Sequence, residues 1–314
     1  MSSSRQDLRD LTRHLMACEP DEIRALRTGA VPRQPGSYGQ WFTTWDLANG
    51  ILRDYSMNLY QLVRMAADEQ LSTSSVLTVM RTWDPIYSTY LGYSGFPVLE
   101  RHAERVAQST ATDRATLVAE LAELAEYANR LTSWSHHWFP WSLGEHYRYP
   151  PGHTETQPAA SGPDVVAARS DPARRVPLRL TWEPLGIQVR ATLACDLNEG
   201  LCADVLAALP FTVLQDHAVV SGKSMYAWAP LVSTAPAPVT ERICDAPPGR
   251  LRFSQATGNK LVIQYGATTE PLRVPVLGTV DPGDLDMLGK VGAAVWDSTF
   301  RTKETIWLTA EPGR

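Results

Sequence analysis

The sequence predicts an α+β protein in which an N-terminal α-helical bundle precedes a closed, eight-stranded β-barrel capped by two helices. Apolar residues up to residue 134 recur with the period of an α-helix, whereas those after residue 177 alternate with polar residues, as in strands. Between these parts, residues 150–177 contain six prolines and no aromatic residue. A chain of 314 residues is long enough for two hydrophobic cores. We therefore expect a bundle over residues 1–149, a linker over 150–176 and a barrel over 177–314.

The helical region is predicted in six segments. Its longest apolar stripe, over residues 41–66, steps alternately by four and three residues, which marks one face of a long helix. A second stripe, Leu117–Leu131, follows Thr112, which we expect to be the N-cap of that helix. Pro85 is expected to break another helix and to leave residues 87–96 as a loop that presents tyrosine rings. The expected helices cover residues 5–17, 21–27, 41–66, 72–90, 97–108 and 113–134.

Residues 134–149 form a strongly aromatic segment. Its first eight residues include four aromatic rings and two histidines. Pro140 argues against a regular helix beyond Phe139. Leaving so much apolar surface in water is costly, so the segment is expected to cover either the mouth of the barrel or a partner subunit. We predict a homodimer on this basis.

The barrel is predicted from a succession of short alternating runs. Leu178, Leu180 and Trp182 alternate with polar residues, and a Pro-Leu-Gly turn leads into a second strand of the same kind. Another hairpin spans residues 211–229, with Ser221-Gly222 as its tight turn. One helix is expected after Asn198 and another from residue 281 to about residue 296. Further strands are expected at residues 250–254, 260–265, 273–280 and 302–309, and closure of the sheet would remove its exposed edges.

The composition excludes several classes of protein. A net charge of −5 lacks the basic excess of a nucleic-acid binder. No apolar run reaches the roughly 18–20 residues that span a bilayer, and the polar start lacks the apolar core of a signal peptide, so we expect a cytoplasmic protein without a membrane segment. His136 and His137 are adjacent and point apart on a helix, so no metal is expected. The four cysteines lack the spacing of a metal site, and free thiols are expected.

Six short motifs in the barrel region carry a resemblance to a known family. With the order of strands and helices, they resemble a bacterial branch of the cyclophilin-like barrel, and the accompanying helical bundle makes the chain look like the cucumopine synthase family. The motifs are Leu178-Arg-Leu-Thr-Trp-Glu183, Ala207-Ala-Leu-Pro210, His217-Ala-Val-Val-Ser-Gly222, Tyr226-Ala-Trp228, Pro248-Gly-Arg-Leu251 and Ile263-Gln-Tyr-Gly266.

Relatives of that family include bacterial Pictet–Spenglerases. The resemblance therefore implies a Pictet–Spengler condensation of a tryptophan-like arylethylamine with an aldehyde or 2-oxo acid. The product would be a tetrahydro-β-carboline, as in alkaloid biosynthesis and secondary metabolism. This chemistry implies an enzyme that requires no cofactor and no metal. The sequence leaves open whether the amine is tryptophan, a methylated tryptophan or a histidine-like compound.

Such a reaction requires an acid and a base whose pKa values lie near neutral pH. His217 is the predicted general base, because imidazole titrates near neutral pH. Tyr226 is predicted to donate a proton to the departing hydroxyl. Glu145, with His146 beside it, is a second candidate base if the aromatic segment closes over the barrel, and nearby tryptophan rings would raise the pKa of its carboxyl. His217, Tyr226 and Trp228 lie on neighbouring strands and meet only if the strand register allows it.

Aromatic rings are expected to hold the amine, and cationic side chains to hold an acidic group on its partner. Tyr265 lies on the side of its strand shared with Leu261 and Ile263. Arg273 has an equally good alternative role in a salt bridge with Glu270. The predicted substrate-binding residues are Trp138, Trp141, His146, Trp228, Arg242, Tyr265 and Arg273.

Two other functions fit parts of the sequence. A small-molecule binding module without catalytic activity would have the same rings and pocket. A peptidyl-prolyl isomerase fits less well, because Arg252 and Phe253 stand alone, without the Phe-Met-Gln-Gly-Gly segment and the paired arginine of those enzymes. A titratable pair within reach of a bound amine would distinguish the enzyme from the binding module.

Overall fold

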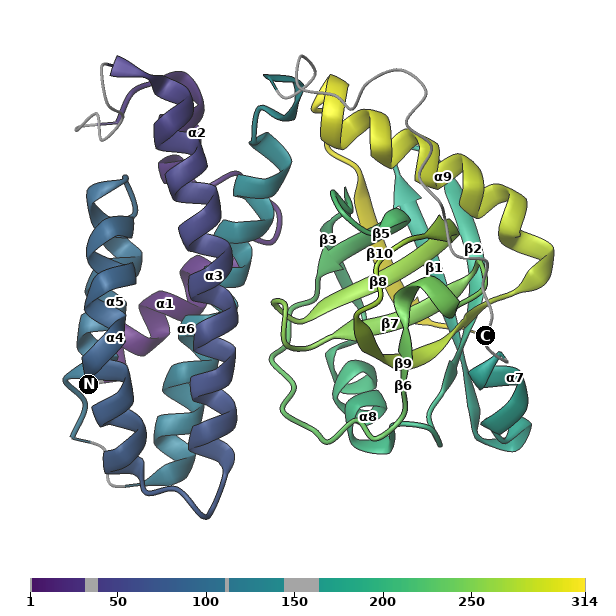
Figure 1. Ribbon diagram of the computed structural model, residues 1–314, viewed down its shortest axis with the longest axis horizontal. Helices are drawn as coiled ribbons and strands as arrows, with labels where there is room; N and C mark the ends of the chain where they lie inside the picture. Colours follow the sequence, from purple (N-terminus) through teal and green to yellow (C-terminus); the bar gives the residue numbers. More distant parts are fainter. Residues whose placement is uncertain (1, 32–38, 111–112, 144–163, 314) are drawn as a thin grey trace. The chain divides into compact units, whose positions relative to one another are not determined.

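The computed structural model describes residues 2–31, 39–110, 113–143 and 164–313. The chain divides into two compact units, one of residues Met1–Phe139 with Ala256–Gly258 and one of Pro140–Gln255 with Asn259–Arg314. The first unit is helical, and the second is a nearly closed antiparallel sheet with helices at its ends (Figure 1). The predicted fold class, a helical bundle followed by a barrel, is therefore confirmed.

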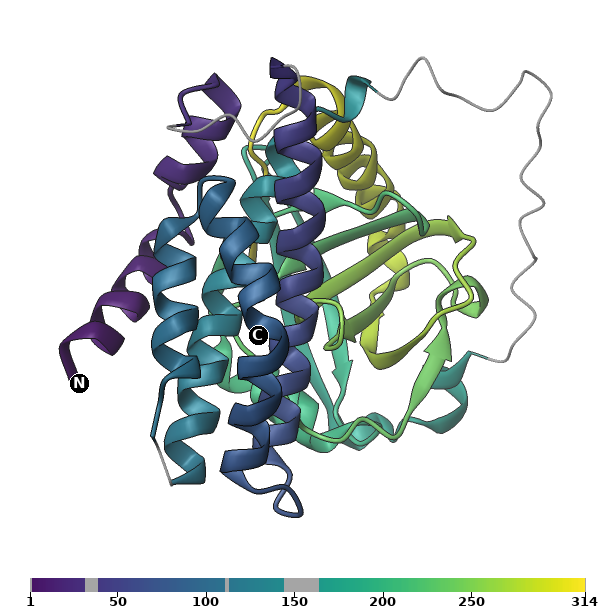
Figure 2. The same cartoon turned by 60° about the vertical axis from the view of Figure 1, so that its left-hand side comes forward.

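The helical unit packs its long helices side by side, as both ribbon views show (Figures 1 and 2). The two apolar stripes that predicted the longest helices are buried from Trp45 to Ala66 in one helix and from Leu117 to Leu131 in the other, whereas Trp41, the first residue of the predicted stripe, is exposed. The described helices of this unit are α1 (Ser2–His14), α2 (Asp21–Thr28), α3 (Trp41–Ala67), α4 (Thr73–Tyr93), α5 (Pro97–Ala107) and α6 (Arg114–Trp138).

Helix α4 corrects one prediction, because it continues through Pro85 to Tyr93. The residue before the proline, Asp84, is buried and accepts a hydrogen bond of 2.6 Å from the hydroxyl of Tyr55 on α3. Buried side chains on both sides of Pro85, including Met80 and Leu91, also hold the helix against the bundle. Tertiary packing therefore outweighs the local cost of the proline.

The start of helix α6 corrects a second prediction. Its N-cap is Asp113, whose carboxylate accepts a hydrogen bond of 2.9 Å from the backbone N–H of Thr116. Thr112, the expected cap, lies outside the described residues. The helix continues to Trp138, four residues beyond the expected end at residue 134 but within the limit that Phe139 and Pro140 predict.

The barrel unit contains a single antiparallel sheet with the strand order β3-β10-β1-β2-β9-β7-β8-β5-β4, while β6 pairs with β9. Ten strands are described instead of the eight expected, because β4 and β6 are additional strands of only two and three residues. The strands are β1 (Arg175–Glu183), β2 (Ile187–Ala194), β3 (Phe211–Leu214), β4 (Asp216–His217), β5 (Gly222–Trp228), β6 (Thr240–Arg242), β7 (Arg250–Ser254), β8 (Lys260–Thr268), β9 (Arg273–Val280) and β10 (Trp307–Pro312).

Helices close the ends of this sheet. Helix α9 (Leu285–Asp297) contacts β2, β4, β5 and β8, and α8 (Glu199–Ala208) lies at the opposite end in Figure 1. Helix α7 (Val165–Arg169) lies within the predicted linker, and its Val166 packs with Val239 and Val276 in a small buried cluster. Asn198, at the start of α8, does not cap the helix with its side chain, which instead donates hydrogen bonds to the carbonyls of Val239 and Val276.

The last strand begins later than predicted. Residues Ser298–Thr302 form η6, an irregular helical segment, and strand β10 starts only at Trp307. Lys303 adopts a left-handed backbone conformation with φ of 61°, which cannot continue either a helix or a strand. Residues 303–306 therefore connect η6 to β10.

The cysteines correct another prediction. Cys195 and Cys202 form a disulfide between the end of β2 and helix α8, with Cα atoms 5.3 Å apart. Cys18 and Cys244 are free thiols, as expected. The spacing of seven residues gave no indication of this pairing, because the loop between the two cysteines determines whether their sulfurs meet.

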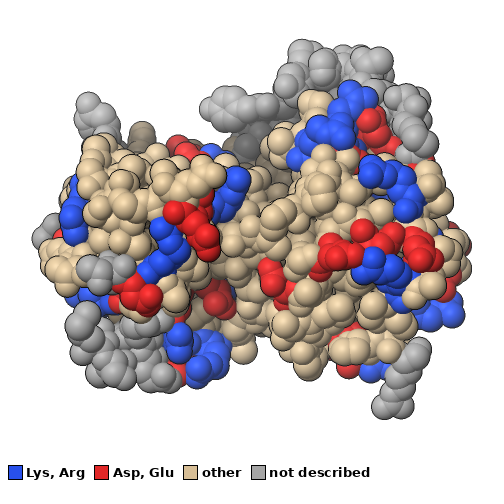
Figure 3. Space-filling view, turned by 90° about the horizontal axis from the view of Figure 1, so that it is seen from below, with Lys and Arg blue, Asp and Glu red and all other residues tan. Residues whose placement is uncertain are grey.

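The surface carries charges of both signs. On the face shown in Figure 3, Lys and Arg side chains lie beside Asp and Glu side chains, without a continuous basic patch among the described residues. None of the described helices combines the length and the apolar character needed to cross a membrane.

Candidate active site

Strand β4 places His217 on the inner face of the barrel. In the pairing of β4 with β5, His217 is opposite Met225 and Asp216 is opposite Tyr226. Paired residues point to the same face of an antiparallel sheet, and Met225 is fully buried in the barrel core. His217 and Tyr226 therefore point to opposite faces, and the register does not bring the predicted base, acid and Trp228 together.

Tyr265 is the residue that meets the imidazole. Its hydroxyl lies 2.8 Å from Nε2 of His217, and Nδ1 of His217 lies 2.7 Å from the carbonyl oxygen of Ala218. Because a carbonyl can only accept a hydrogen bond, Nδ1 carries the proton in the neutral imidazole. Nε2 is then the acceptor, and the phenol of Tyr265 donates to it.

Burial tunes both members of this pair. The side chain of His217 is only 4% exposed, and this desolvation lowers its pKa. Tyr265 is partly exposed, and burial raises the pKa of its phenol. Both shifts favour the neutral forms at neutral pH, so the pair consists of an unprotonated base and a protonated phenol.

Helix α9 determines the position of the Tyr265 ring. Gly292 lies directly against this ring, since a Cβ atom at that position would be 2.5 Å from the ring carbons of Tyr265. Any larger residue at Gly292 would therefore displace the ring or the helix. The glycine lets the helix backbone form one wall of the site.

Further rings continue from the imidazole in one direction. The centroid of the Phe300 ring lies 5.8 Å from that of His217, and the Trp141 ring lies 6.1 Å from Phe300. Trp296 also contacts Phe300, at 5.4 Å. The described structure thus brings three of the predicted site residues, His217, Tyr265 and Trp141, into one continuous group through Phe300.

Phe300 was not predicted from the sequence. It lies in η6, where a run of mixed residues after α9 gave no periodic pattern. A usable signal was its spacing of four residues from Trp296, which places two rings on one side of a helical segment.

A buried polar group supports the backbone of His217 from the same segment. The hydroxyl of Thr299 accepts a hydrogen bond of 2.9 Å from the backbone N–H of His217 and donates to a carboxylate oxygen of Asp216 at 3.3 Å. Lys303 donates from its amine to the backbone carbonyl of Thr299. Burial lowers the pKa of the Lys303 amine to about 8, and the Asp216 carboxylate opposes this shift. Thr299 and Lys303 were also missed in the sequence.

Tyr226 and Trp228 form a separate cluster with Lys260. Their rings contact each other edge to face at 5.2 Å, and the Lys260 amine lies 4.5 and 4.7 Å from the two ring centroids. These are cation–π contacts on the face of β5 that points away from His217. Tyr226 and Trp228 therefore do not belong to the His217 group.

Arg242 and Arg273 also lie apart from this group. They face each other across the β6–β9 pair and are both exposed. Arg242 binds both carboxylate oxygens of Asp245, at 2.6 and 2.8 Å, and Arg273 donates to the carbonyl oxygen of Thr240 at 2.8 Å. Glu270 instead accepts a hydrogen bond from Ser221. The described ion pairs do not include the alternative bridge between Arg273 and Glu270.

Three predicted residues remain. Trp138 ends helix α6 of the helical unit, where the guanidinium of Arg27 lies 4.4 Å above its ring. Glu145 and His146 lie outside the described residues. Within the part of the chain that the structure describes, no group of three or more His, Cys, Asp or Glu side chains is arranged to hold a metal ion.

Comparison with known families identifies the helical unit. Residues 5–138 match the family model of the cucumopine synthase C-terminal helical bundle domain. The helical unit is cucumopine synthase-like. For the helical unit this agrees with the resemblance inferred from the sequence, whereas the motifs that suggested it lie in the barrel, outside the matched residues. The family's name places the bundle at the C-terminal end of cucumopine synthase, whereas this cucumopine synthase-like bundle precedes the barrel.

Among solved structures, the chain is similar to McbB, whose structure was determined in complex with tryptophan. The two are 31% identical in the matched part, with a TM-score of 0.40. The match covers 43% of this chain and 44% of the McbB chain, so it spans less than half of each. The curated proteins give no match.

Proposed function

We propose that this cucumopine synthase-like chain is a cofactor-independent Pictet–Spenglerase. It would condense an arylethylamine, such as tryptophan or a methylated tryptophan, with an aldehyde or a 2-oxo acid and give a tetrahydro-β-carboline. The observation that carries the proposal is the His217–Tyr265 pair, a neutral base and a phenol donor joined by a hydrogen bond beside several rings. The family match of the helical unit supports the same reaction class.

The reaction begins when the amine adds to the carbonyl compound and the adduct loses water. The amine nitrogen forms a bond to the carbonyl carbon, and the carbonyl oxygen leaves as water after it has gained two protons. One of these protons comes from the amine nitrogen, and Tyr265, which is partly exposed, reaches the substrate and supplies the other; its phenolate regains a proton from solvent before the ring closes. The rings of Phe300 and Trp141 offer electron-rich faces to the iminium cation that results.

Ring closure and loss of a proton complete the reaction. The indole carbon attacks the iminium carbon, and the ring then carries one proton too many. Because His217 is almost completely buried behind Tyr265, the proton passes to the phenol oxygen while the phenol proton moves to Nε2 of His217. Aromaticity is restored, and the imidazolium returns its proton to solvent in the next cycle.

The alternative functions receive less support from the same residues. Arg252 is fully buried and donates to Gln264 and to the carbonyl of Ile243, so its guanidinium is not presented to a peptide as in a prolyl isomerase. A binding module without activity would not require a donor and a base in hydrogen-bond contact.

The proposal is tested by incubating the full-length protein with tryptophan or methylated tryptophan and a panel of aldehydes and 2-oxo acids. The cyclised product has the same mass as the simple imine, so each mixture is treated with cyanoborohydride before mass spectrometry. Only the imine gains two hydrogens. Tryptophan labelled with deuterium at the indole carbon that closes the ring should lose its label. Absence of an unreduced, unlabelled product above the spontaneous background across the panel would overturn the proposal.

A further inference from the structure

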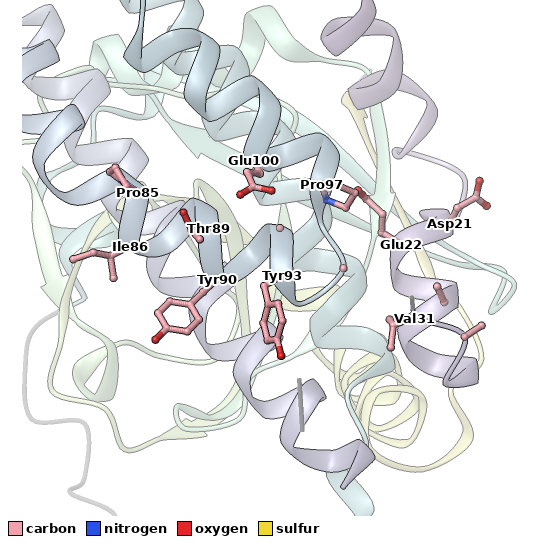
Figure 4. A pocket seen from close by; sticks show the side chains of 14 residues that line it. Asp21, Glu22, Val31, Pro85, Ile86, Thr89, Tyr90, Tyr93, Pro97 and Glu100 are labelled. Carbon is pink, nitrogen blue, oxygen red and sulfur yellow. The ribbon is translucent and has the colours of Figure 1, made fainter. Parts of the chain in front are cut away.

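A groove of about 1170 Å³ lies in the helical unit, bordered by helices α2, α4 and α5 (Figure 4). The acids that line it are engaged within the chain. Asp21 forms an ion pair of 2.8 Å with Arg24, Glu22 accepts two hydrogen bonds, and Glu100 also interacts with another group of the protein. The described lining of this groove therefore offers a ligand no uncompensated charge.

The barrel unit instead contains a group that can react covalently, the disulfide between Cys195 and Cys202. Cys195 directly follows strand β2, and Cys202 lies in the first turn of helix α8. Helix α8 covers one end of the sheet, whereas α9, against which the His217 group lies, covers the other (Figure 1). The disulfide is therefore separate from the candidate active site.

The two sulfurs of this bond differ in accessibility. Cys202 is only 2% exposed, whereas Cys195 is partly exposed. A thiolate has to reach the sulfur that it attacks, so attack falls on Cys195 and the sulfur of Cys202 becomes the leaving group. The backbone N–H of Cys202 donates to the carbonyl of Asn198 at the N-terminal end of α8. The positive end of the helix dipole there offsets part of the cost of a buried thiolate.

The loop that the disulfide closes holds the segment at the end of helix α7. The carboxylate of Asp196 accepts a hydrogen bond of 2.8 Å from the backbone N–H of Asp171 and one of 3.2 Å from the hydroxyl of Ser170. Both donors lie just after α7. Leu197 packs in the same buried cluster as Val166 of α7. The closed loop thus fastens the C-terminal end of α7 to the barrel.

The N-terminal end of α7 has an attachment of its own. Asp164, its N-cap, binds the guanidinium of Arg250, which is fully buried and also pairs with Glu241 at 2.8 Å. The same carboxylate accepts hydrogen bonds from the backbone N–H groups of Val166 and Ala167. These contacts do not involve the loop of residues 195–202, so they persist when the disulfide opens.

We propose that the Cys195–Cys202 bond is a thiol–disulfide exchange site for a dithiol reductant, and that its opening frees the C-terminal end of α7. One thiolate of the reductant forms a bond to Sγ of Cys195, and the bond to Cys202 breaks with its electron pair on Sγ of Cys202. The second thiol of the reductant then displaces Cys195. The two cysteines gain two electrons and two protons, and the reductant becomes a disulfide. This inference does not rest on the proposed Pictet–Spenglerase activity.

The exchange is tested on the folded, full-length protein with dithiothreitol as the dithiol. Samples are precipitated with acid, alkylated with N-ethylmaleimide after denaturation, and digested with trypsin for mass spectrometry. Both cysteines lie in one tryptic peptide, residues 191–223, so reduction adds two alkyl groups to that peptide. We expect reduction without denaturant. A bond that is reduced only in the denatured protein, or that does not form in the presence of glutathione disulfide, would overturn the proposal.

Single variants test which sulfur is attacked. Cys202→Ser leaves the partly exposed thiol of Cys195, and Cys195→Ser leaves the buried thiol of Cys202. The mixed disulfide with glutathione should form about tenfold faster in Cys202→Ser than in Cys195→Ser. Cys244, a buried free thiol, is an internal reference that should react slowly in both variants. Equal rates at Cys195 and Cys202 would contradict the assigned order of attack.

Hydrogen exchange tests the effect on α7. The backbone N–H of Asp171 should exchange about tenfold faster in the reduced protein, whereas those of Val166 and Ala167 should not change, because Asp164 still holds them. Asp196→Ala, with the disulfide intact, should give the same fast exchange at Asp171 and no further increase on reduction.

Unchanged exchange at Asp171 in the fully reduced protein would refute the link between the disulfide and α7. The double variant Cys195→Ser/Cys202→Ser should show the exchange pattern of the reduced protein and should not respond to dithiothreitol. A response of this variant to dithiothreitol would show that the effect arises elsewhere. Failure of the condensation assay alone leaves the inference intact.

Discussion

Nε2 of His217 lies 2.8 Å from the phenol oxygen of Tyr265, although 48 residues separate them in the chain. Strand β5 pairs with both β4 and β8, and this order of strands brings the two side chains to the same inner face. The carbonyl of Ala218 fixes the tautomer of the imidazole from the other side. The pair can therefore transfer a proton from the partly exposed phenol to a buried nitrogen.

Replacement of Tyr265 by Phe should lower turnover strongly. The variant keeps the ring that packs against Gly292 and removes only the hydroxyl, so we expect a loss of about 100-fold in kcat from the missing acid–base group. The matched variant Tyr226→Phe removes a hydroxyl from the opposite face of the sheet and should change kcat little. Kinetics of both variants with one substrate pair decide between them. A larger loss for Tyr226→Phe would return the role of acid to Tyr226.

His217→Gln should also lower turnover about 100-fold, because the amide cannot accept the proton that the phenol releases. Burial lowers the pKa of His217 below its ordinary value of 6.5, so the wild-type rate should stay constant from neutral pH down to 6.5 and fall only at lower pH. Steady-state rates measured across this range test both statements. Unchanged turnover in the variant would assign the base to Glu145 or His146.

The same shift in pKa predicts how His217 affects stability. Its folded pKa is lower than its unfolded pKa, so the unfolded chain takes up a proton first as the pH falls. The contribution of His217 to the free energy of unfolding is therefore at its full value above about pH 6.5 and is lost progressively below it. Thermal melting of the barrel unit should therefore depend less on pH in His217→Gln than in the wild-type protein. Parallel melting curves for the two proteins would contradict this prediction.

Glu22 should have the opposite dependence in the helical unit. Burial raises the pKa of its carboxyl from 4.5 to about 7, so the folded protein prefers the protonated form. This contribution to stability is complete below about pH 4.5 and is lost as the pH rises through about 7. The melting temperature of the wild-type protein should fall from weakly acidic to weakly alkaline pH, and Glu22→Gln should remove part of this fall. Melting is measured by the helical circular dichroism signal. Glu104→Gln, at an exposed position, should retain the wild-type slope.

Gly292→Ala should disturb the site without replacing an ionisable group. The added methyl group would be 2.5 Å from the Tyr265 ring, and overpacking of this kind costs about 1–3 kcal/mol. The double variant Gly292→Ala/Tyr265→Ala should recover part of the stability that the two single variants lose separately, because the methyl group then occupies vacated space. Denaturant unfolding of the four proteins measures this coupling. Additive losses would mean that the ring and the helix do not restrain each other.

Local patterns predicted the elements well, because burial on one side leaves a period in the sequence. Apart from Trp41 and Ile187, which begin their elements, the stripes of α3 and α6 and the alternating apolar residues of β1 and β2 are buried as their periods indicate. Predictions from single residues were less successful. Pro85 lies inside α4 because Asp84 and its neighbours are held by the bundle, and Cys195 pairs with Cys202 because a loop brings them together. Neither effect is local.

The candidate site was predicted in part for a related reason. His217, Tyr265 and Trp141 were named from their chemistry, but the register of β4 against β5 decides which face each occupies. A shift by one residue would have joined His217 to Tyr226 instead. Thr299 and Lys303 could not be predicted, because they lie in the irregular segment η6 and just after it, where no period marks the buried side, and Phe300 was indicated only by its spacing from Trp296.

Strand β4 has only two residues, and this length affects when the site can form. So short a strand gives His217 little support of its own, and the hydrogen bond from its backbone to Thr299 comes from a residue 82 positions later. During synthesis, the imidazole therefore leaves the ribosome long before the hydroxyl that holds it. The proposed base can reach its working position only after strands β5 to β9 and helix α9 have been made, so the site is completed late in the folding of the barrel.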